Sequence, residues 1–215
     1  MSEDSSRPTL HTETQFSHTI MELLGRIASS FGDLKQPVKA FIAGGAAVHL
    51  YTGHRVSEDL DVEFSRRVIV PSDLVIAYID ETGAERAVIF DTNYNSTLAL
   101  MDEGYIEHAH LIGTPNGDGR MEVYVLSAID LAISKLSRFA DNDRGDIAAL
   151  AREGLIGSTE LEQKANDALG GYVGGIEMVK LNIRDAVKMV REIEQNREQT
   201  NERNGPSNDD TTIRP

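Results

Sequence analysis

The chain has no cysteine, no long apolar run and few basic residues. Without cysteine it forms neither disulfide bonds nor thiolate metal sites, and this composition fits a reducing compartment. No window approaches the roughly 18 apolar residues of a membrane-spanning helix, and the polar start "MSEDSSRPTLHTETQ" lacks the apolar segment of a secretory signal. We therefore expect a cytoplasmic protein with no membrane partner.

Acidic side chains outnumber basic ones by 35 to 21, which gives a formal net charge of -14. Such a protein is repelled overall by the phosphate backbone of nucleic acids, so broad nonspecific nucleic-acid binding is not expected. A local basic site is still compatible with this charge, and so are carboxylates that hold divalent cations. General solubility is the simplest explanation of the acidic excess.

Length and patterning predict one α+β domain with a helical extension. The chain has 215 residues, of which 40% are apolar, enough for a sizeable core. Helix and strand patterns in the first part predict a mixed-sheet core with flanking helices, and the later patterns predict a helical C-terminal half. We assign the regions as a disordered N-terminus (1–12), the α/β core (13–126), a helical region (127–195) and a disordered polar tail (196–215).

Apolar periodicity predicts the individual elements. Ser127 with Asp130, and Thr159 with Glu162, have the spacing of capping boxes at helix starts. Helices are expected over 13–30, 46–52, 71–80, 128–140, 146–154, 159–169 and 176–198. Strands are expected over 38–43, 59–64, 66–70, 86–91, 96–101, 109–113 and 121–126, with breaks at 141–145 and 170–175.

Two adjacent glycines and two nearby aspartates form the most informative segment. Gly44 and Gly45 end an apolar strand, and after a spacer of 13 residues Asp59 and Asp61 follow, one residue apart. A diglycine between a strand and a helix lets a ligand approach the backbone and directs helix N–H groups at an anion. Residues i and i+2 of a strand share a face, so the two carboxylates can converge on one or two divalent ions. Mg²⁺ is favoured because it is commonly held by one or two carboxylates together with substrate phosphates.

Each part of this pattern has a simpler explanation when taken alone. An isolated Asp-x-Asp is usually the solvated face of a strand, and an isolated Gly-Gly is usually a turn. Lys135 alone would be a solvated helix residue, Asp146 can cap the helix that follows it, and Asp143 is expected to be a solvated turn residue. His108 and His110 have strand spacing but no evident third ligand, so we expect a surface pair rather than a metal site.

Taken together, the diglycine, its spacer and "DLDV" resemble the signature of the nucleotidyltransferase superfamily with the polymerase-β-like core. The matching positions are Gly44, Gly45, Ser57, Asp59, Leu60, Asp61 and Val62. The downstream segment "LSAIDLAISKLSRFADNDRGDIAAL" is similar to the stretch after the core in nucleotidyltransferase-like toxins of bacterial toxin–antitoxin and abortive-infection systems. Its matching positions are Lys135, Arg144 and Asp146, and the whole resemblance covers roughly residues 38–150.

The resemblance implies a nucleotidyltransferase-like core and transfer of NMP from an NTP to an acceptor hydroxyl, with one or two Mg²⁺ ions. It implies metal ligation by Asp59 and Asp61, nucleotide contacts from Gly44, Gly45, Ser57 and Lys135, and catalytic roles for Asp59, Asp61, Lys135 and Asp146. The superfamily often has a third carboxylate on a neighbouring strand. Glu122 is our first choice for it and Glu63 the second.

The resemblance also implies RNA, such as the 3′ end of tRNA, as the acceptor, and a cognate antitoxin protein as a partner. A small molecule or a protein side chain stays open as the acceptor. Because no third carboxylate is evident, a second hypothesis also stays open. In that hypothesis the chain is a catalytically weak or inactive nucleotidyltransferase-fold protein that acts as a regulatory or binding module.

Overall fold

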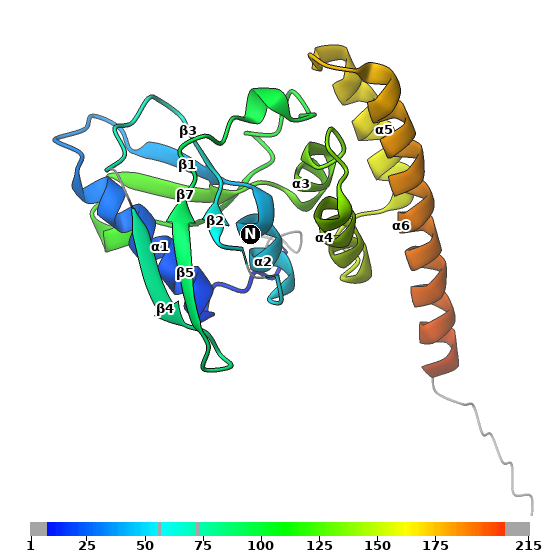
Figure 1. Cartoon of the computed structure of the whole chain (residues 1–215), viewed down its shortest axis with the longest axis horizontal. Helices are drawn as coiled ribbons and strands as arrows, with labels where there is room; N and C mark the ends of the chain where they lie inside the picture. The colour runs from blue at the N-terminus through cyan, green and yellow to red at the C-terminus, as the bar shows by residue number, and fades with distance from the viewer. Residues whose placement is uncertain (1–7, 56, 72–73, 205–215) are drawn as a thin grey trace, which may run out of the picture.

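The computed structural model describes residues 8–55, 57–71 and 74–204. It has the predicted α+β fold, with sheets and two helices in the first part and a helical C-terminal half (Figure 1). The helices are α1 (Gln15–Ser29), α2 (Gly44–Thr52), α3 (Ala128–Ser134), α4 (Asp141–Arg152), α5 (Ser158–Ala168) and α6 (Ile176–Asn204). The strands are β1 (Val38–Ile42), β2 (Asp59–Leu60), β3 (Val62–Phe64), β4 (Val75–Ile79), β5 (Glu85–Phe90), β6 (His110–Gly113) and β7 (Met121–Val125). The 3₁₀ turns are η1 (Ser96–Leu98), η2 (Pro115–Gly117) and η3 (Leu169–Gly171).

The strands form two sheets that meet at Asp61. The larger sheet has the order β3-β1-β7-β6, with β1 parallel to β7 and antiparallel to β3. The smaller sheet has the order β2-β5-β4, with β2 parallel to β5. The predicted single strand over 59–64 is therefore divided between the two sheets, and Asp61 lies at the crossing between β2 and β3. This crossing brings the carboxyl end of β5 next to the diglycine after β1.

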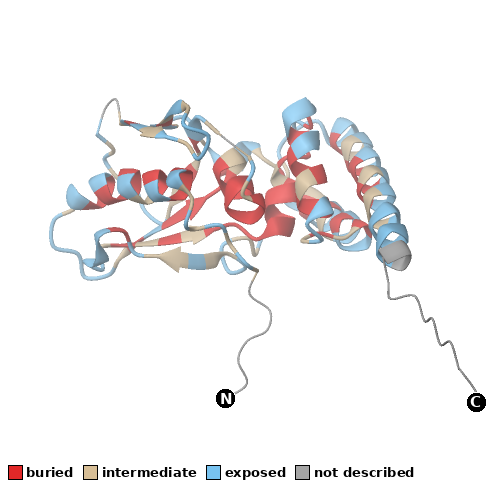
Figure 2. Cartoon of the chain, turned by 90° about the horizontal axis from the view of Figure 1, so that it is seen from below, coloured by how far each residue is buried: buried red, intermediate tan, exposed pale blue. Residues whose placement is uncertain are grey.

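Helix α1 forms because its apolar residues recur along one face. Thr14 caps its start by accepting a hydrogen bond from the N–H of Ser17. The residues of the apolar face are nearly fully buried against the sheets, and they are Phe16, Ile20, Leu23, Leu24 and Ile27. Burying each of these side chains stabilises the fold by about 1.5–3 kcal/mol. Figure 2 shows this buried side along the length of the helix.

The C-terminal helices pack on the sheet region through α2 and α3. Helix α2 contacts α3 and α4, while α6 lies along α4 and α5 (Figures 1 and 2). The side of α6 that faces α4 and α5 is apolar and buried, and its residues are Val179, Ile183, Ala186, Val187 and Val190. Helix α6 continues to Asn204, beyond the boundary at 195 that the polar composition suggested.

Several local predictions were wrong because tertiary pairing overrode the sequence signal. The helix predicted over 71–80 is strand β4, whose β-branched residues alternate between exposed and buried and pair with β5; Ser72 and Asp73 lie outside the described residues. Segments 66–70 and 96–101, predicted as strands, contain no strand. The predicted break at 141–145 is instead the first turn of α4.

The helix caps also differ in part from the prediction. Ser127 caps α3 as predicted, because its hydroxyl accepts a hydrogen bond from the N–H of Asp130. Helix α3 ends at Ser134, however, well before the predicted end at 140. Helix α5 begins after Gly157 with no side-chain cap, so the second predicted capping box does not form.

No helix in the described part of the chain is long and apolar enough to cross a membrane. Residues 8–12 belong to the segment predicted to be disordered. Within it, the N–H of His11 donates a hydrogen bond to the carbonyl oxygen of Leu50. Residues 1–7 and 205–215, the remaining parts of the two segments predicted to be disordered, lie outside the described residues.

Candidate functional site

The diglycine packs directly against the second aspartate. Gly44 has φ +59°, a left-handed conformation that favours glycine, and a Cβ at this position would overlap the Oδ2 atom of Asp61. A Cβ on Gly45 would lie 2.8 Å from the hydroxyl of Ser57. The N–H of Ala43 donates a hydrogen bond of 2.9 Å to the backbone carbonyl of Asp61. The structure thus brings the predicted residues Gly44, Gly45, Ser57 and Asp61 together.

The diglycine also opens helix α2. Its N-cap is Ala43, whose side chain offers no hydrogen bond to the first backbone N–H groups of the helix. An uncapped helix N-terminus favours anions, because its N–H groups and its dipole both act on negative charge. Asp61 lies beside this end of α2, so the position can accommodate an anion together with a cation that neutralises the carboxylate.

Asp91 is the third carboxylate of this cluster. Strand β5 pairs in parallel with β2, with Asp59 opposite Ile89 and Leu60 opposite Phe90, so the next residues in this register are Asp61 and Asp91. The N–H of Asp91 donates to the carbonyl oxygen of Leu60 at 3.1 Å, which continues the pairing. Residues in register on adjacent parallel strands lie about 4.8 Å apart and point to the same face. The apolar strand that ends in aspartate, "RAVIFD", carried the signal that could have identified Asp91 from the sequence.

The surroundings of Asp61 favour its protonated form. Its pKa is raised from 3.8 to about 6, chiefly because the carboxylate is buried, and also because Asp91 and Asp59 place negative charge nearby. The positive charges of Lys135 and Arg138 oppose the rise. These five groups therefore share one electrostatic environment. Three carboxylates so close together are stabilised by a proton or by a cation.

Lys135 and Asp146, each predicted separately to be functional, form a buried ion pair. The Nζ of Lys135 lies 2.8 Å from Oδ2 of Asp146, and both side chains are less than a tenth exposed. The Nε of Arg55 donates to the other oxygen, Oδ1, at 2.9 Å. Asp146 lies inside α4, so it does not cap that helix. It holds Lys135 and Arg55 in place instead.

The start of α4 carries a second charged pair. Asp143 is buried, contrary to the prediction of a solvated turn residue, and accepts two hydrogen bonds of 2.8 Å from the guanidinium of Arg138. It also accepts from the N–H of Ala140 at 3.0 Å. Burial opposes ionisation, yet the Arg138 hydrogen bonds and the one from Ala140 lower the pKa of Asp143. This pair fixes the Arg138 guanidinium at a position from which its charge lowers the pKa of Asp61.

Glu122 and Glu63, the residues chosen from the sequence as the third carboxylate, have other partners. Glu122 on β7 pairs in register with Lys39, which lies near the start of β1 and four residues before Ala43. Strand β7 is on one side of β1, and β3, which follows Asp61, is on the other side. This puts the backbone of Glu122 on the order of 15 Å from Asp61, and its carboxylate accepts a hydrogen bond from the hydroxyl of Tyr124. Glu63 accepts a hydrogen bond of 2.9 Å from Tyr105.

A cavity of about 520 Å³ opens beside Asp91. Its wall contains the side chains of Arg66 and Arg67 and polar residues of segment 91–97, including Tyr94. Burial first, and then the charges of Asp61 and Glu63, raise the pKa of Tyr94, so its hydroxyl stays protonated near neutral pH. A cavity lined by two arginines and several hydroxyls, with Asp91 in its wall, can accept a polar, phosphate-bearing molecule.

Comparison with known families gives one match. The model of a family described as "Nucleotidyltransferase of unknown function (DUF6036)" matches residues 19–169, a segment that contains the diglycine, all three aspartates and the Lys135–Asp146 pair. No curated protein matches the chain, and no solved structure does. The match supports the nucleotidyltransferase part of the resemblance; the toxin and abortive-infection part stays a prediction.

Proposed function

From the premise that the chain belongs to this nucleotidyltransferase family, we propose that it transfers NMP from an NTP to an acceptor hydroxyl and releases pyrophosphate, in the cytoplasm. One observation carries the proposal. Asp61 packs against Gly44 at the N-terminus of α2, and the charges of Asp91 and Asp59 act on it. That is a position for a divalent cation next to a position for phosphate.

The carboxylate cluster fits Mg²⁺. Its donors are hard oxygen atoms, and the raised pKa of Asp61 indicates carboxylates that need a positive charge nearby. Asp59, Asp61 and Asp91 would hold one or two ions, with Asp91 in the role first given to Glu122. When bound, Mg²⁺ supplies charge neutralisation on the triphosphate and lowers the pKa of a coordinated hydroxyl.

The chain's own residues bind and orient the nucleotide. The N–H groups of Gly44 and Gly45 would donate to the phosphates, and only a glycine at 44 leaves room for Asp61. The Ser57 hydroxyl, beside Gly45, donates to the carbonyl oxygen of Asp59 at 3.0 Å, so it would have to turn from this acceptor to donate to a phosphate. The ammonium of Lys135 has three donors, so it can contact a phosphate oxygen while Asp146 holds it. Positive charge fixed there stabilises charge that develops on the phosphates during transfer.

RNA, with the 3′ end of tRNA as the specific case, is the acceptor that we propose, with the chain acting as the toxin of a toxin–antitoxin or abortive-infection system. The cavity beside Asp91 supports a phosphate-bearing acceptor, because Arg66 and Arg67 line it. The net charge of -14 opposes a large RNA surface, which fits recognition of one strand end. A cognate antitoxin protein would then be a partner.

Incubation with each α-labelled NTP, Mg²⁺ and total RNA plus lysate protein tests this proposal. We expect label in RNA, absent with EDTA and absent in Asp61→Asn, while the exposed Asp33→Asn variant labels normally. Label in protein or in a small molecule would refute the RNA acceptor but keep the reaction. Mg²⁺-dependent NTP binding without label in any fraction would favour the regulatory or binding module instead.

A further inference from the structure

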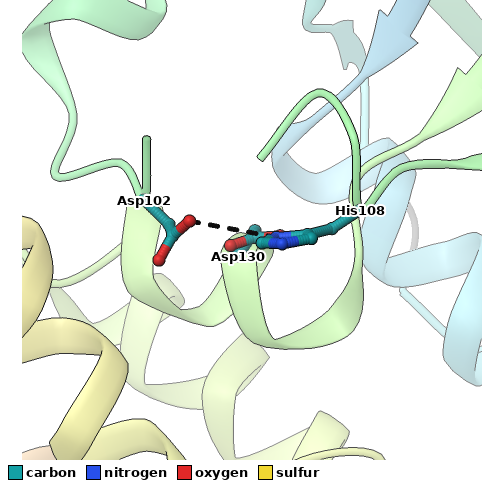
Figure 3. A group of neighbouring side chains, drawn as sticks. All are labelled: Asp102, His108 and Asp130. Carbon is teal, nitrogen blue, oxygen red and sulfur yellow. Dashed lines mark hydrogen bonds and ion pairs between the residues drawn. The ribbon is translucent and has the colours of Figure 1, made fainter. Parts of the chain in front are cut away.

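A second group of metal-ligand side chains lies apart from the carboxylate cluster. Asp102, His108 and Asp130 each offer one ligand atom, and these atoms all lie within 4.8 Å of one another. Figure 3 shows the Asp102 carboxylate and the His108 ring directed toward Asp130, which comes from the first turn of α3. We propose that these three residues bind a divalent transition-metal ion, with Zn²⁺ as the best fit. This proposal does not depend on the proposed function.

The distances suit such an ion. The Nδ1 of His108 lies 3.0 Å from Oδ2 of Asp130 and 3.9 Å from Oδ1 of Asp102. Ligand atoms of a tetrahedral zinc site lie about 3.3 Å apart, because the metal–ligand bonds are about 2.0–2.1 Å long. These two separations lie on either side of this value, and all three ligand atoms lie within 4.8 Å of one another, so side-chain movements of roughly 0.5–1.5 Å would complete the geometry.

Asp130 supplies an independent indication of a ligand. Its side chain is fully buried, and its Oδ2 accepts a hydrogen bond of 2.5 Å from the Ser127 hydroxyl. Its Oδ1 atom has no hydrogen-bond partner among the described residues. A buried carboxylate oxygen without a partner is destabilising, and such atoms usually mark a missing water or ion. An ion held by both carboxylate oxygens of Asp130 would give Oδ1 a partner, in addition to contacting Oδ2, the oxygen nearest to His108.

The donor set selects the kind of metal. One imidazole nitrogen and two carboxylate oxygens suit Zn²⁺ and similar transition metals, whereas Mg²⁺ and Ca²⁺ prefer oxygen alone. The ammonium of Lys164 lies 3.6 Å from Oδ2 of Asp102, on the oxygen other than the one nearest His108. Asp102 can therefore keep Lys164 on one oxygen and bind the metal with the other.

A metal here would tie a loop to the helix that carries Lys135. Asp102 and His108 belong to the turns before β6, and α3 runs from Asp130 in its first turn to a C-cap at Lys135. The ion pair between Asp102 and Lys164 would connect this metal site to α5 as well. The ion would thus fix the position of α3 at the end opposite to Lys135.

Cobalt absorption tests the site in the full chain after treatment with EDTA, with excess Mg²⁺ present to occupy all-oxygen sites. We expect one equivalent of Co²⁺ to give a visible absorption band that Zn²⁺ abolishes. His108→Ala and Asp102→Asn should each raise the Kd for Co²⁺ at least about tenfold. Loss of a residue that only supports a metal ligand already weakens binding by about this factor. His18→Ala, on the exposed side of α1, should leave the Kd unchanged.

Two controls keep the result interpretable. Circular dichroism of the metal-free variants checks that they fold, and Zn²⁺ should raise the Tm of the unmodified chain but not that of His108→Ala. Absence of a Co²⁺ band in the unmodified chain would overturn the proposal, and would leave His108 as an imidazole hydrogen-bonded to Asp130 with the Asp102 carboxylate nearby. A band retained in both His108→Ala and Asp102→Asn, or abolished by Asp61→Asn, would also overturn it.

Discussion

Replacing Asp61 with asparagine should stabilise the metal-free protein, although it removes a proposed metal ligand. Asparagine has nearly the same shape and carries no charge. Burial and the nearby Asp91 and Asp59 raise the pKa of Asp61 from 3.8 to about 6. The folded state therefore binds this proton more tightly than the unfolded state does, and the ionised carboxylate opposes folding at neutral pH.

The size and pH dependence of the effect follow from the two pKa values. At about 1.4 kcal/mol for each pH unit between them, the ionised Asp61 lowers the free energy of unfolding by up to about 3 kcal/mol at pH 7.5. Near pH 3 the carboxyl is largely protonated in both states and the penalty is nearly absent; it grows as the pH rises from about 3 to about 6. At pH 4.5 we expect a difference of about 1 kcal/mol.

Urea unfolding in EDTA at both pH values measures the difference. Asp61→Asn should be the more stable protein at pH 7.5, by up to about 3 kcal/mol, which corresponds to a Tm increase of up to about 6–12 °C. Asp33→Asn, at an exposed position, should change stability by less than about 0.5 kcal/mol. A variant that is no more stable than the unmodified chain at pH 7.5, or a gain that is equal at both pH values, would refute the electrostatic reasoning.

Three further substitutions test the site. In urea unfolding, Gly44→Ala should lower the free energy of unfolding much more than Gly83→Ala does. Both glycines have positive φ, but only at Gly44 would the new Cβ meet Asp61. Equal losses in the two variants would contradict this packing. Asp91→Asn should weaken Mg²⁺·NTP binding in calorimetry and Glu122→Gln should not, and the reverse would restore Glu122 as the third ligand. Asp146→Asn should cost about 3 kcal/mol in urea unfolding, since it leaves a buried lysine unpaired. Asp141→Asn, at the exposed first residue of the same helix, should cost at most about 1 kcal/mol, the value of a charge at a helix N-terminus.

Local periodicity was sufficient to predict most elements of the fold. The helical repeat of α1 and α6 and the apolar runs of β1, β5 and β7 appear in the sequence as they do in the structure. The strand β4 was mistaken for a helix because its preceding proline resembles a helix start. Its true conformation depends on pairing with β5, which no local pattern reports. Segment 96–101 has strand-like composition but no partner strand.

The site was predictable to the extent that its residues are close in sequence. The diglycine and Asp59 with Asp61 are separated by one short helix, so spacing alone could place them together. Asp91 reaches the cluster through the parallel pairing of β5 with β2. The group of Asp102, His108 and Asp130 depends on packing of a turn against α3, which no local pattern reports. His108 and His110, which the sequence suggested as a pair on one strand, are on different elements, since only His110 lies on β6.

Isothermal titration of the full chain with each NTP tests the central claim most directly, in Mg²⁺ and again in EDTA. We expect one NTP to bind per chain and to require Mg²⁺. Asp61→Asn should weaken this binding at least about tenfold, as loss of a metal-site group does, while the exposed Asp33→Asn variant binds normally. Absence of binding for all four nucleotides, or equal binding in EDTA and in Asp61→Asn, would contradict this claim.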